Sequence, residues 1–211
     1  GYHSAVEVAT NVIDCLHSTA TSHGRIFIVE VMGHKVGWLT LSAGIAGGAD
    51  VILLPEIPYD INKVAKTLNS RIDNGKKFSI LAVAEGAISK EEAKLSKKEF
   101  KKKRAEENYP SIVYRIAEEL QDKIDNEIRV CVPGHFQRGG SPCAYDRVLC
   151  TRLGATAAKF VKEKTFGVMV GMVNGQCVPV PLEEVAGKLK SVPVDCGEIQ
   201  AARQIGISFG D

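Results

Sequence analysis

The sequence lacks paired cysteines, long apolar runs and an excess of either charge. Its cysteines stand singly, without a Cys-x-x-Cys pair, which disfavours both a zinc knuckle and a dithiol redox site. We expect these thiols to be buried or partly buried in a reducing compartment, with disulfide bonds as the less favoured alternative. The six cysteines are Cys15, Cys131, Cys143, Cys150, Cys177 and Cys196.

No apolar run approaches the roughly 20 residues that a membrane-spanning helix needs. The opening segment, GYHSAVEVATNVIDCLHS, carries acids and histidines where a signal peptide would have a basic and then an apolar region. We therefore expect a cytoplasmic protein without a membrane partner.

The charges nearly balance, because 27 basic and 25 acidic residues leave a net charge of +2. This balance offers no broad electrostatic field for nucleic acid or anionic lipid, so any basic function must be local. Hydrophobic residues make up 45% of the chain and charged residues 25%. These proportions are typical of a globular protein that buries a core.

Strand-like and helical patterns alternate along the chain. Nearly continuous apolar runs at residues 25–31, 51–55, 78–87 and 128–132 are typical of strands covered on both faces of a parallel sheet. Apolar residues at helical spacing separate these runs and also precede them, over residues 4–20. We predict an α/β fold, a three-layer parallel-type sheet flanked by helices.

The charged segment after the third strand is predicted to be one solvated helix. Ser89 and Glu92 form a capping box at its start, and Glu99 and Lys103 have the favourable i,i+4 spacing. The basic run at residues 101–104 could also indicate a nucleic-acid patch. Acids interleave with these bases and no aromatic platform accompanies them, so the solvated helix is strongly favoured.

Three further elements follow from local signals. Asp60 is suited to cap the helix after the second strand. Residues 143–164 have helical spacing, and Asn174-Gly175 between two apolar runs predicts a β-hairpin. Short helices are expected to finish the chain.

Polar residues and glycines follow three of the predicted strands. Met32-Gly33-His34 follows the first strand, Glu85 the third, and the segment from Gly134 to Arg138 the fourth. Ligands of parallel α/β sheets bind beyond the carboxyl ends of the strands. We therefore expect these residues to form one rim.

The rim residues suit a phosphorylated sugar. Arg138 offers a planar fork for phosphate oxygens, and His135 can donate a hydrogen bond. The glycines let backbone N–H groups approach an anion, and Glu85 can accept hydrogen bonds from sugar hydroxyls. Taken alone, Gly139-Gly140 fits an ordinary turn and His135 a structural histidine, so the prediction rests on their joint placement.

Arg25 and Arg129 stand at the starts of predicted strands, opposite to the rim. They cannot easily reach the same ligand within one subunit. They are either surface charges or residues that reach the site of a neighbouring subunit across a symmetric interface.

The stretch RVCVPGHFQRGGSPCAYDR at residues 129–147 resembles the signature of the phosphofructokinase family at every fixed position. Further motifs occur in the order that the family requires, so the resemblance covers nearly the whole chain. These motifs are VEVMG at residues 29–33, GIAGGAD at 44–50, Pro55-Glu56 and AEGA at 84–87.

The resemblance implies a fructose 6-phosphate site and a homo-oligomer, either a dimer or a tetramer. Arg25 and Arg129 match family positions that reach the phosphate bound by a neighbouring subunit. The helical insert at residues 89–120 resembles bacterial members that use ATP or pyrophosphate. The residues implied for the substrate within the subunit are Met32, Gly33, Glu85, His135 and Arg138.

The resemblance also implies a division of the chain. Residues 1–142 would form the fructose 6-phosphate-binding lobe, and residues 195–211 a C-terminal helix that returns to it. Residues 143–194 would pack on a donor-binding lobe, leaving apolar surface exposed or covered by self-association.

The chain departs from the family pattern in two ways. The glycine-rich phosphate turn and the Thr-Ile-Asp-Asn-Asp run, whose first aspartate is the general base, are absent from these 211 residues. We therefore expect a fragment whose donor site for ATP or pyrophosphate, with its Mg²⁺ ligands, lies elsewhere, and we expect the fragment to bind no metal or cofactor. His34 stands where many members carry an arginine that stabilises transition-state charge.

The sequence thus predicts the acceptor-binding part of a 6-phosphofructokinase that is inactive by itself. The alternative is a non-catalytic module for sugar-phosphate binding or oligomerisation. A nucleic-acid binder is a remote third possibility.

Overall fold

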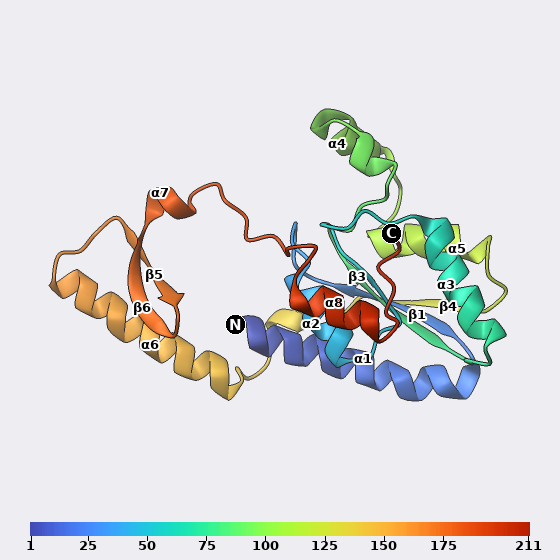
Figure 1. Cartoon of the computed structure of the whole chain (residues 1–211), viewed down its shortest axis with the longest axis horizontal. Helices are drawn as coiled ribbons and strands as arrows, with labels where there is room; N and C mark the ends of the chain where they lie inside the picture. Colours follow the sequence, from blue (N-terminus) through green and yellow to red (C-terminus); the bar gives the residue numbers. More distant parts are fainter. The chain divides into compact units, whose positions relative to one another are not determined.

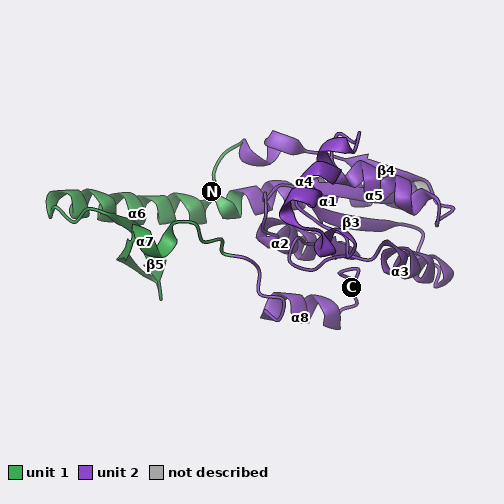
Figure 2. Cartoon of the chain, turned by 90° about the horizontal axis from the view of Figure 1, so that it is seen from above, with its two compact units in different colours: residues 1–4, 140–190 green, residues 5–139, 191–211 purple. Residues whose placement is uncertain are grey.

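A computed structural model describes all 211 residues, except for the side chain of His23 (Figure 1). The chain forms two compact units. The sheet unit contains residues Ala5–Gly139 and Ser191–Asp211, and the helix-hairpin unit contains Gly1–Ser4 and Gly140–Lys190 (Figure 2).

The sheet unit is built on four parallel strands in the order β2-β3-β1-β4. The non-consecutive order means that helical crossovers connect the strands, so the predicted α/β fold with a parallel sheet is confirmed. The strands are β1 (Ile26–Val31), β2 (Val51–Leu53), β3 (Ser79–Ala84) and β4 (Ile128–Cys131).

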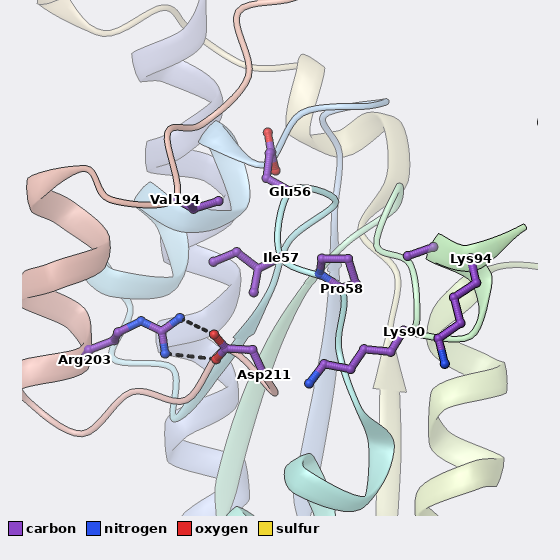
Figure 3. A pocket seen from close by; sticks show the side chains of 9 residues that line it. Glu56, Ile57, Pro58, Lys90, Lys94, Val194, Arg203 and Asp211 are labelled. Atoms are coloured by element: carbon purple, nitrogen blue, oxygen red, sulfur yellow. Dashed lines mark hydrogen bonds and ion pairs between the residues drawn. The ribbon is translucent and has the colours of Figure 1, made fainter.

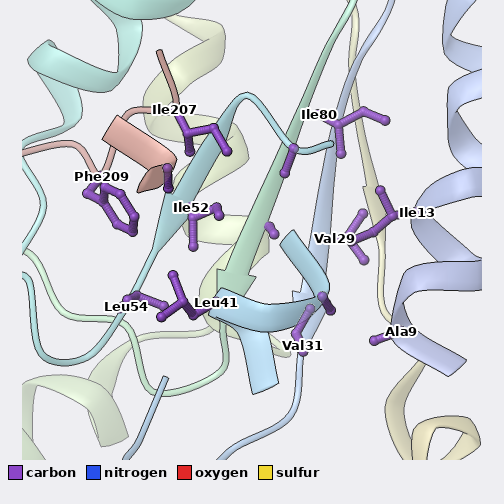
Figure 4. Close-up of a cluster of buried hydrophobic side chains, with 14 of the residues drawn as sticks. Ala9, Ile13, Val29, Val31, Leu41, Ile52, Leu54, Ile80, Ile207 and Phe209 are labelled. Atoms are coloured by element: carbon purple, nitrogen blue, oxygen red, sulfur yellow. The ribbon is translucent and has the colours of Figure 1, made fainter. Parts of the chain in front are cut away.

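Helices cover both faces of this sheet and make it the middle of three layers. One apolar core lies against α1, α2 and α8, and Figure 4 shows Val29 and Val31 of the sheet meeting Ile13 and Leu41 of the helices there. The other core lies against α3 and α5 and contains the alternate residues Ile26 and Ile28 of β1. The helices are α1 (Tyr2–His23), α2 (Trp38–Ala46), α3 (Ile61–Asp73), α5 (Ile112–Gln121) and α8 (Gly197–Gln204).

The predicted cap of α3 is confirmed. The Asp60 side chain accepts a hydrogen bond of 2.9 Å from the backbone N–H of Asn62. This bond satisfies one of the backbone donors that the first turn of a helix leaves without a partner. The helix connects the edge strand β2 to its neighbour β3.

The charged segment at residues 89–107 is not one continuous helix, so that prediction was wrong. It contains a short 3₁₀ helix, η1 (Glu92–Lys94), and α4 (Lys97–Glu106), which Figure 1 shows projecting from the sheet. The capping box predicted from Ser89 and Glu92 is present, with N–H to side-chain oxygen distances of 2.9 and 3.2 Å. Leu95 then adopts an extended conformation, which ends the first helical turns.

A second capping box starts α4 and was missed in the sequence. Ser96 and Glu99 exchange hydrogen bonds between their side chains and backbone N–H groups. Glu99, expected to pair with Lys103, therefore caps its own helix. All residues of α4 are exposed or half-buried, so the expectation of a solvated segment is confirmed.

The helix-hairpin unit consists of α6 (Ala144–Lys162), β5 (Val168–Val173), β6 (Gln176–Pro181) and α7 (Leu182–Val185). The strands β5 and β6 pair antiparallel, as the hairpin prediction required. Asn174 and Gly175 both have positive φ, 48° and 76°, which is the backbone of a type I′ turn.

The start of α6 is tied to the first residues of the chain within the helix-hairpin unit. Asp146, which is 4% exposed, accepts hydrogen bonds from the backbone N–H and the hydroxyl of Ser4 at 2.8 and 2.5 Å. The backbone N–H of Cys143 donates to the Ser4 hydroxyl at 3.0 Å. Asp146 of the signature stretch therefore has a structural role in this unit.

All six cysteines are free thiols. Four are partly buried, as expected, but Cys15 and Cys150 are exposed, so the expectation was wrong for these two. Burial raises the pKa of Cys131 above its usual value. Among the helices of the described residues, none combines the length and the apolar character that crossing a membrane demands.

Candidate functional site

The carboxyl ends of β3, β1 and β4 lie side by side. In the register of the sheet, Val31 is opposite Ala84 and Val29 is opposite Cys131. The segments that follow these strands therefore start from one edge of the sheet. We call them together the rim: residues 32–37 after β1, residues 85–88 after β3, and η2 (Gly134–Arg138) after β4.

Glu85 connects two segments of the rim. Its Oε1 accepts hydrogen bonds from the backbone N–H groups of Gly33, at 3.1 Å, and His34, at 2.5 Å. Its own N–H donates to the carbonyl of Val31 at 3.0 Å. Both side-chain bonds use Oε1, so Oε2 is the oxygen that can accept from a ligand hydroxyl.

Close backbone contacts require glycine at two positions of the rim, one between its segments and one within residues 32–37. A Cβ added to Gly86 would lie 2.1 Å from the carbonyl oxygen of His34, and one added to Gly33 would lie 2.5 Å from the carbonyl oxygen of Val36. His34 itself has a φ of 56°, which is a left-handed conformation that costs a non-glycine residue roughly 1 kcal/mol or more. The rim after β1 is therefore a constrained turn, and Glu85 holds it.

Gln137 fastens η2 to the end of β1. This side chain is 2% exposed, and its Oε1 accepts a hydrogen bond of 3.1 Å from the backbone N–H of Met32. Its Nε2 donates to the carbonyls of Gly134 and Glu30 at 3.3 and 3.5 Å. The sequence interpretation did not assign Gln137 a role, although its position between His135 and Arg138 was the available signal.

With Gln137 turned inward, His135 and Arg138 project outward on η2. Both side chains are exposed, and neither forms a hydrogen bond or ion pair with the part of the chain that the structure describes. Gly134 has a φ of 55°, a conformation that glycine adopts without a steric penalty and that starts this tight turn. The rim thus presents an unpaired guanidinium and an imidazole on the segment that Gln137 fastens to Met32.

Glu30 is a second carboxylate that interacts electrostatically with Glu85. Burial raises the pKa of Glu30, and the negative charge of Glu85 adds to this rise. Among the described residues, no three His, Cys, Asp or Glu side chains are grouped as a metal site requires, so this pair of carboxylates is not completed by a third such ligand.

Arg25 and Arg129 lie at the other end of the sheet. Arg25 directly precedes β1, and Arg129 is opposite Phe27 near the start of β4. Both guanidinium groups pair with the exposed carboxylate of Glu127, whose pKa falls below its usual value mainly because Arg25 donates a hydrogen bond to it. The structure therefore joins the two arginines to each other and separates them from the rim of the same chain.

Glu56, from the Pro55-Glu56 motif, supports the rim from the β2 side. Its carboxylate accepts hydrogen bonds from the N–H of Gly37, at 3.0 and 3.1 Å, and from the N–H of Val192 at 3.0 Å. A carboxylate at the start of α2 is favourable because the N-terminus of a helix carries a partial positive charge. Glu56 also borders a pocket of about 540 Å³ near the Arg203–Asp211 ion pair (Figure 3).

Comparison with known proteins gives a consistent result. The family model described as "Phosphofructokinase" matches residues 1–161. An ATP-dependent 6-phosphofructokinase of Spirochaeta thermophila is 51% identical over 211 residues, which cover 100% of this chain and 58% of that protein. A protein of the same name from Propionibacterium freudenreichii is 45% identical, with coverage of 100% and 61%. The chain thus spans less than two thirds of the length of these curated relatives.

Solved structures with the same fold include two phosphofructokinases. The phosphofructokinase of Saccharomyces cerevisiae matches with a TM-score of 0.70 and 32% identity over 87% of this chain and 23% of that chain. The pyrophosphate-dependent enzyme of Marinobacter aquaeolei matches with a TM-score of 0.73 over 97% of this chain and 54% of that chain. At 20% identity, the second likeness supports the fold alone.

Proposed function

Because this chain belongs to the phosphofructokinase family, we propose that it is the sugar-phosphate-binding part of a 6-phosphofructokinase. The whole protein would transfer a phosphoryl group from ATP or pyrophosphate to O1 of fructose 6-phosphate. The observation that carries this proposal is the rim. The unpaired side chains of Arg138 and His135 project from η2, which is bonded to Met32, and Glu85 binds the next residue, Gly33. A guanidinium and a carboxylate together suit a ligand with a phosphate at one end and hydroxyl groups along its length.

Each rim residue has a separate role in this proposal. Arg138 binds the phosphate of fructose 6-phosphate bidentately, and His135 donates a hydrogen bond to it. Glu85 accepts from a sugar hydroxyl through Oε2, since Oε1 is occupied by Gly33 and His34. Met32 and Gly33 line the sugar and hold its reacting oxygen at a fixed position. Positioning of this kind is a large part of catalysis in phosphoryl transfer.

His34 is the rim residue placed to stabilise charge during transfer. It is exposed, and its backbone is held by Glu85 in the left-handed conformation. An imidazolium would stabilise developing negative charge, whereas a neutral imidazole would do so less well than a guanidinium. We therefore propose that His34 contributes most when it is protonated.

The donor and Mg²⁺ would be bound by other parts of the whole protein. The relatives at 51% and 45% identity are named ATP-dependent 6-phosphofructokinases, which favours ATP over pyrophosphate as the donor. The 211-residue chain alone would then bind the sugar phosphate without kinase activity. A coupled assay that detected turnover of ATP or pyrophosphate by this chain would contradict that part of the proposal.

Arg25 and Arg129 would serve the site of a neighbouring subunit in a dimer or tetramer. The support for this is their position, because both lie at the amino ends of their strands while the rim lies at the carboxyl ends. A symmetric interface can bring such a distant pair onto a partner's ligand. A cytoplasmic location follows from the proposed glycolytic role.

Calorimetric titration of fructose 6-phosphate into the chain tests the site. Arg138→Ala is expected to weaken binding at least tenfold, since it removes a charge-assisted bidentate contact. Lys123→Ala, which removes an exposed cation far from the rim, is the matched control and is expected to bind like the wild type. Equal affinities for all three proteins would reject the assignment of Arg138.

The alternative is a non-catalytic module that binds sugar phosphates or mediates oligomerisation. The two hypotheses differ in the whole protein and make the same prediction for the rim. Restoring the glycine-rich turn and the aspartate base from the coding sequence, followed by a kinase assay, distinguishes them. Activity of the restored protein that is lost in Arg138→Ala would support the enzyme.

A further inference from the structure

The charged insert contains a buried ion-pair network that the proposed function does not explain. Glu92 of η1 has a side chain that is 0% exposed, and it lies between two guanidinium groups. Arg115 of α5 donates to Oε1 and Oε2 of Glu92, both at 2.8 Å. Arg104 of α4 donates to Oε2 at 3.1 Å. One carboxylate thus joins three helical segments of the insert.

Arg115 anchors the network in the sheet unit. Its Nη2 donates to the hydroxyl of Tyr59 at 3.1 Å, and its Nη1 donates to Glu107 at 2.8 Å. Tyr59 is 0% exposed and belongs to the core between the sheet and the helices α3 and α5. The network is therefore attached to the rigid part of the fold through Arg115.

Glu92 and Arg115 both stay charged in this buried network. Burial alone would raise the pKa of Glu92. Hydrogen bonds from Arg115 and from the N–H of Ser89, together with the positive charges of Arg104 and Arg115, instead lower this pKa to about 2. Burial would lower the pKa of Arg115, but its bond to Glu92 raises it further above the usual value. A fully ionised buried network is rigid, because separating its members would leave unpaired charges in a medium of low polarity.

Arg104 connects this network to the rim. Its Nη2 donates to the carbonyl of Ala87 at 3.0 Å as well as to Glu92. Ala87 is two residues after Glu85, and its own N–H donates to the carbonyl of Ala84 at 2.9 Å. The turn that carries Glu85 is therefore held at one end by β3 and at the other by the guanidinium of Arg104.

The same arginine borders the rim in space. A pocket of about 410 Å³ is lined by Glu85 and Gly86 of the rim together with Phe100 and Arg104 of α4. The guanidinium of Arg104 lies 5.2 Å from the centre of the Phe100 ring, a contact that fixes its orientation on the helix. Since Gly86 contacts the carbonyl of His34, a shift of this turn is passed directly to the segment after β1.

We propose that Arg104 is a positioning residue of the sugar-phosphate site, which holds the Glu85 turn in place through the carbonyl of Ala87. The insert then sets the geometry of the rim, and its α4 helix is more than a solvated connection. This inference rests on the proposed function for its effect on the substrate. Its structural part, the position of the Gly33 and His34 backbone, is independent of any ligand.

Arg104 and Arg115 differ in a way that allows a clean test. Arg115 pairs with Glu92 through two bonds of 2.8 Å, so removing Arg104 leaves the buried carboxylate paired. Removing Arg115 would instead leave Glu92 and Tyr59 short of a buried partner. Arg104→Ala is therefore expected to fold, whereas Arg115→Ala is expected to lower the melting temperature sharply.

The experiment measures two quantities in the 211-residue chain: the amide chemical shifts of Gly33 and His34 by NMR, and the dissociation constant of fructose 6-phosphate by calorimetry. Arg104→Ala is expected to shift both amide signals without ligand and to weaken binding about tenfold, the equivalent of one hydrogen bond. Lys102→Ala, an exposed neighbour on α4, is expected to change neither. Unchanged amide signals in Arg104→Ala would overturn the proposal.

The two readouts separate this proposal from the proposed function. If the wild type does not bind fructose 6-phosphate, the function fails, but shifted Gly33 and His34 signals in Arg104→Ala would still support the positioning role. If Arg104→Ala does not fold, the same two measurements on Arg104→Lys test the positioning role. Lysine keeps the positive charge beside Glu92. Its single ammonium group lacks the planar, multidentate geometry with which the guanidinium binds both Glu92 and the carbonyl of Ala87. Wild-type amide signals and wild-type affinity in that variant would reject the proposal.

Discussion

The Oε1 atom of Glu85 accepts a hydrogen bond from the backbone N–H of Gly33 at 3.1 Å, and this contact joins the turns that follow β3 and β1. The two strands are neighbours in the sheet, and their last residues, Ala84 and Val31, are in register. A carboxylate at the end of one strand can therefore fix the backbone at the end of the next.

Gly86→Ala is expected to distort the rim. The new Cβ would lie 2.1 Å from the carbonyl oxygen of His34, which is backbone and cannot rotate away. The variant should lose about 1–3 kcal/mol of unfolding free energy and bind fructose 6-phosphate more weakly. Denaturant unfolding and calorimetry measure these effects.

Gly197→Ala is the control for that substitution. A Cβ at Gly197 would meet no atom within 4 Å, and Gly197 is the first residue of α8. Its stability should be unchanged or slightly higher, because alanine has the greater helix propensity. Equal stability of the two variants would contradict the close contact between Gly86 and His34.

Gln137→Ala is expected to release η2 from the end of β1. The substitution removes three hydrogen bonds and leaves the N–H of Met32 without its acceptor, at a cost of about 1–3 kcal/mol. The affinity for fructose 6-phosphate should fall because His135 and Arg138 lose their support. Gln200→Ala, which removes an exposed side chain bonded to the carbonyl of Asp195, should leave the affinity unchanged. Wild-type affinity in Gln137→Ala would show that η2 keeps its position without this side chain.

The stability of the chain is expected to fall in acid because of Glu92. The folded-state pKa of about 2 is below the usual value of 4.5, so the stabilising contribution is complete above pH 4.5 and is lost as the pH falls towards 2. Urea unfolding at pH 6 and pH 3 should show a smaller acid-induced loss for Glu92→Gln than for the wild type. The same loss in both proteins would assign the effect to other carboxylates.

Glu127→Ala tests whether Arg25 and Arg129 act as a pair. Glu127 binds both guanidinium groups, so without it the two positive charges should repel and separate. If the whole protein forms the proposed oligomer, its affinity for fructose 6-phosphate should fall while the melting temperature changes little, since all three side chains lie near the surface. Tighter binding in the variant would mean that Glu127 competes with the phosphate for the arginines.

Much of the fold could be predicted because its signals are local. Continuous apolar runs such as Ile26–Val31 indicated buried parallel strands, and Asn174-Gly175 indicated the hairpin. The insert was predicted less well. Glu92 and Glu99 look alike in the sequence, yet the first is buried between two arginines and the second caps a solvated helix. Periodicity cannot distinguish these environments, because they depend on partners distant in the sequence.

The sequence by itself determined the strand ends at which polar residues gather, and hence the rim residues Met32, Gly33, Glu85, His135 and Arg138. It did so because apolar runs end where the chain leaves the sheet. Only the tertiary structure decided what those residues contact. Glu85 binds backbone N–H groups, Gln137 holds η2 to β1, and Arg104 reaches Ala87 from the insert. These contacts join segments that are up to 107 residues apart, so they exist only after the sheet has aligned the strands.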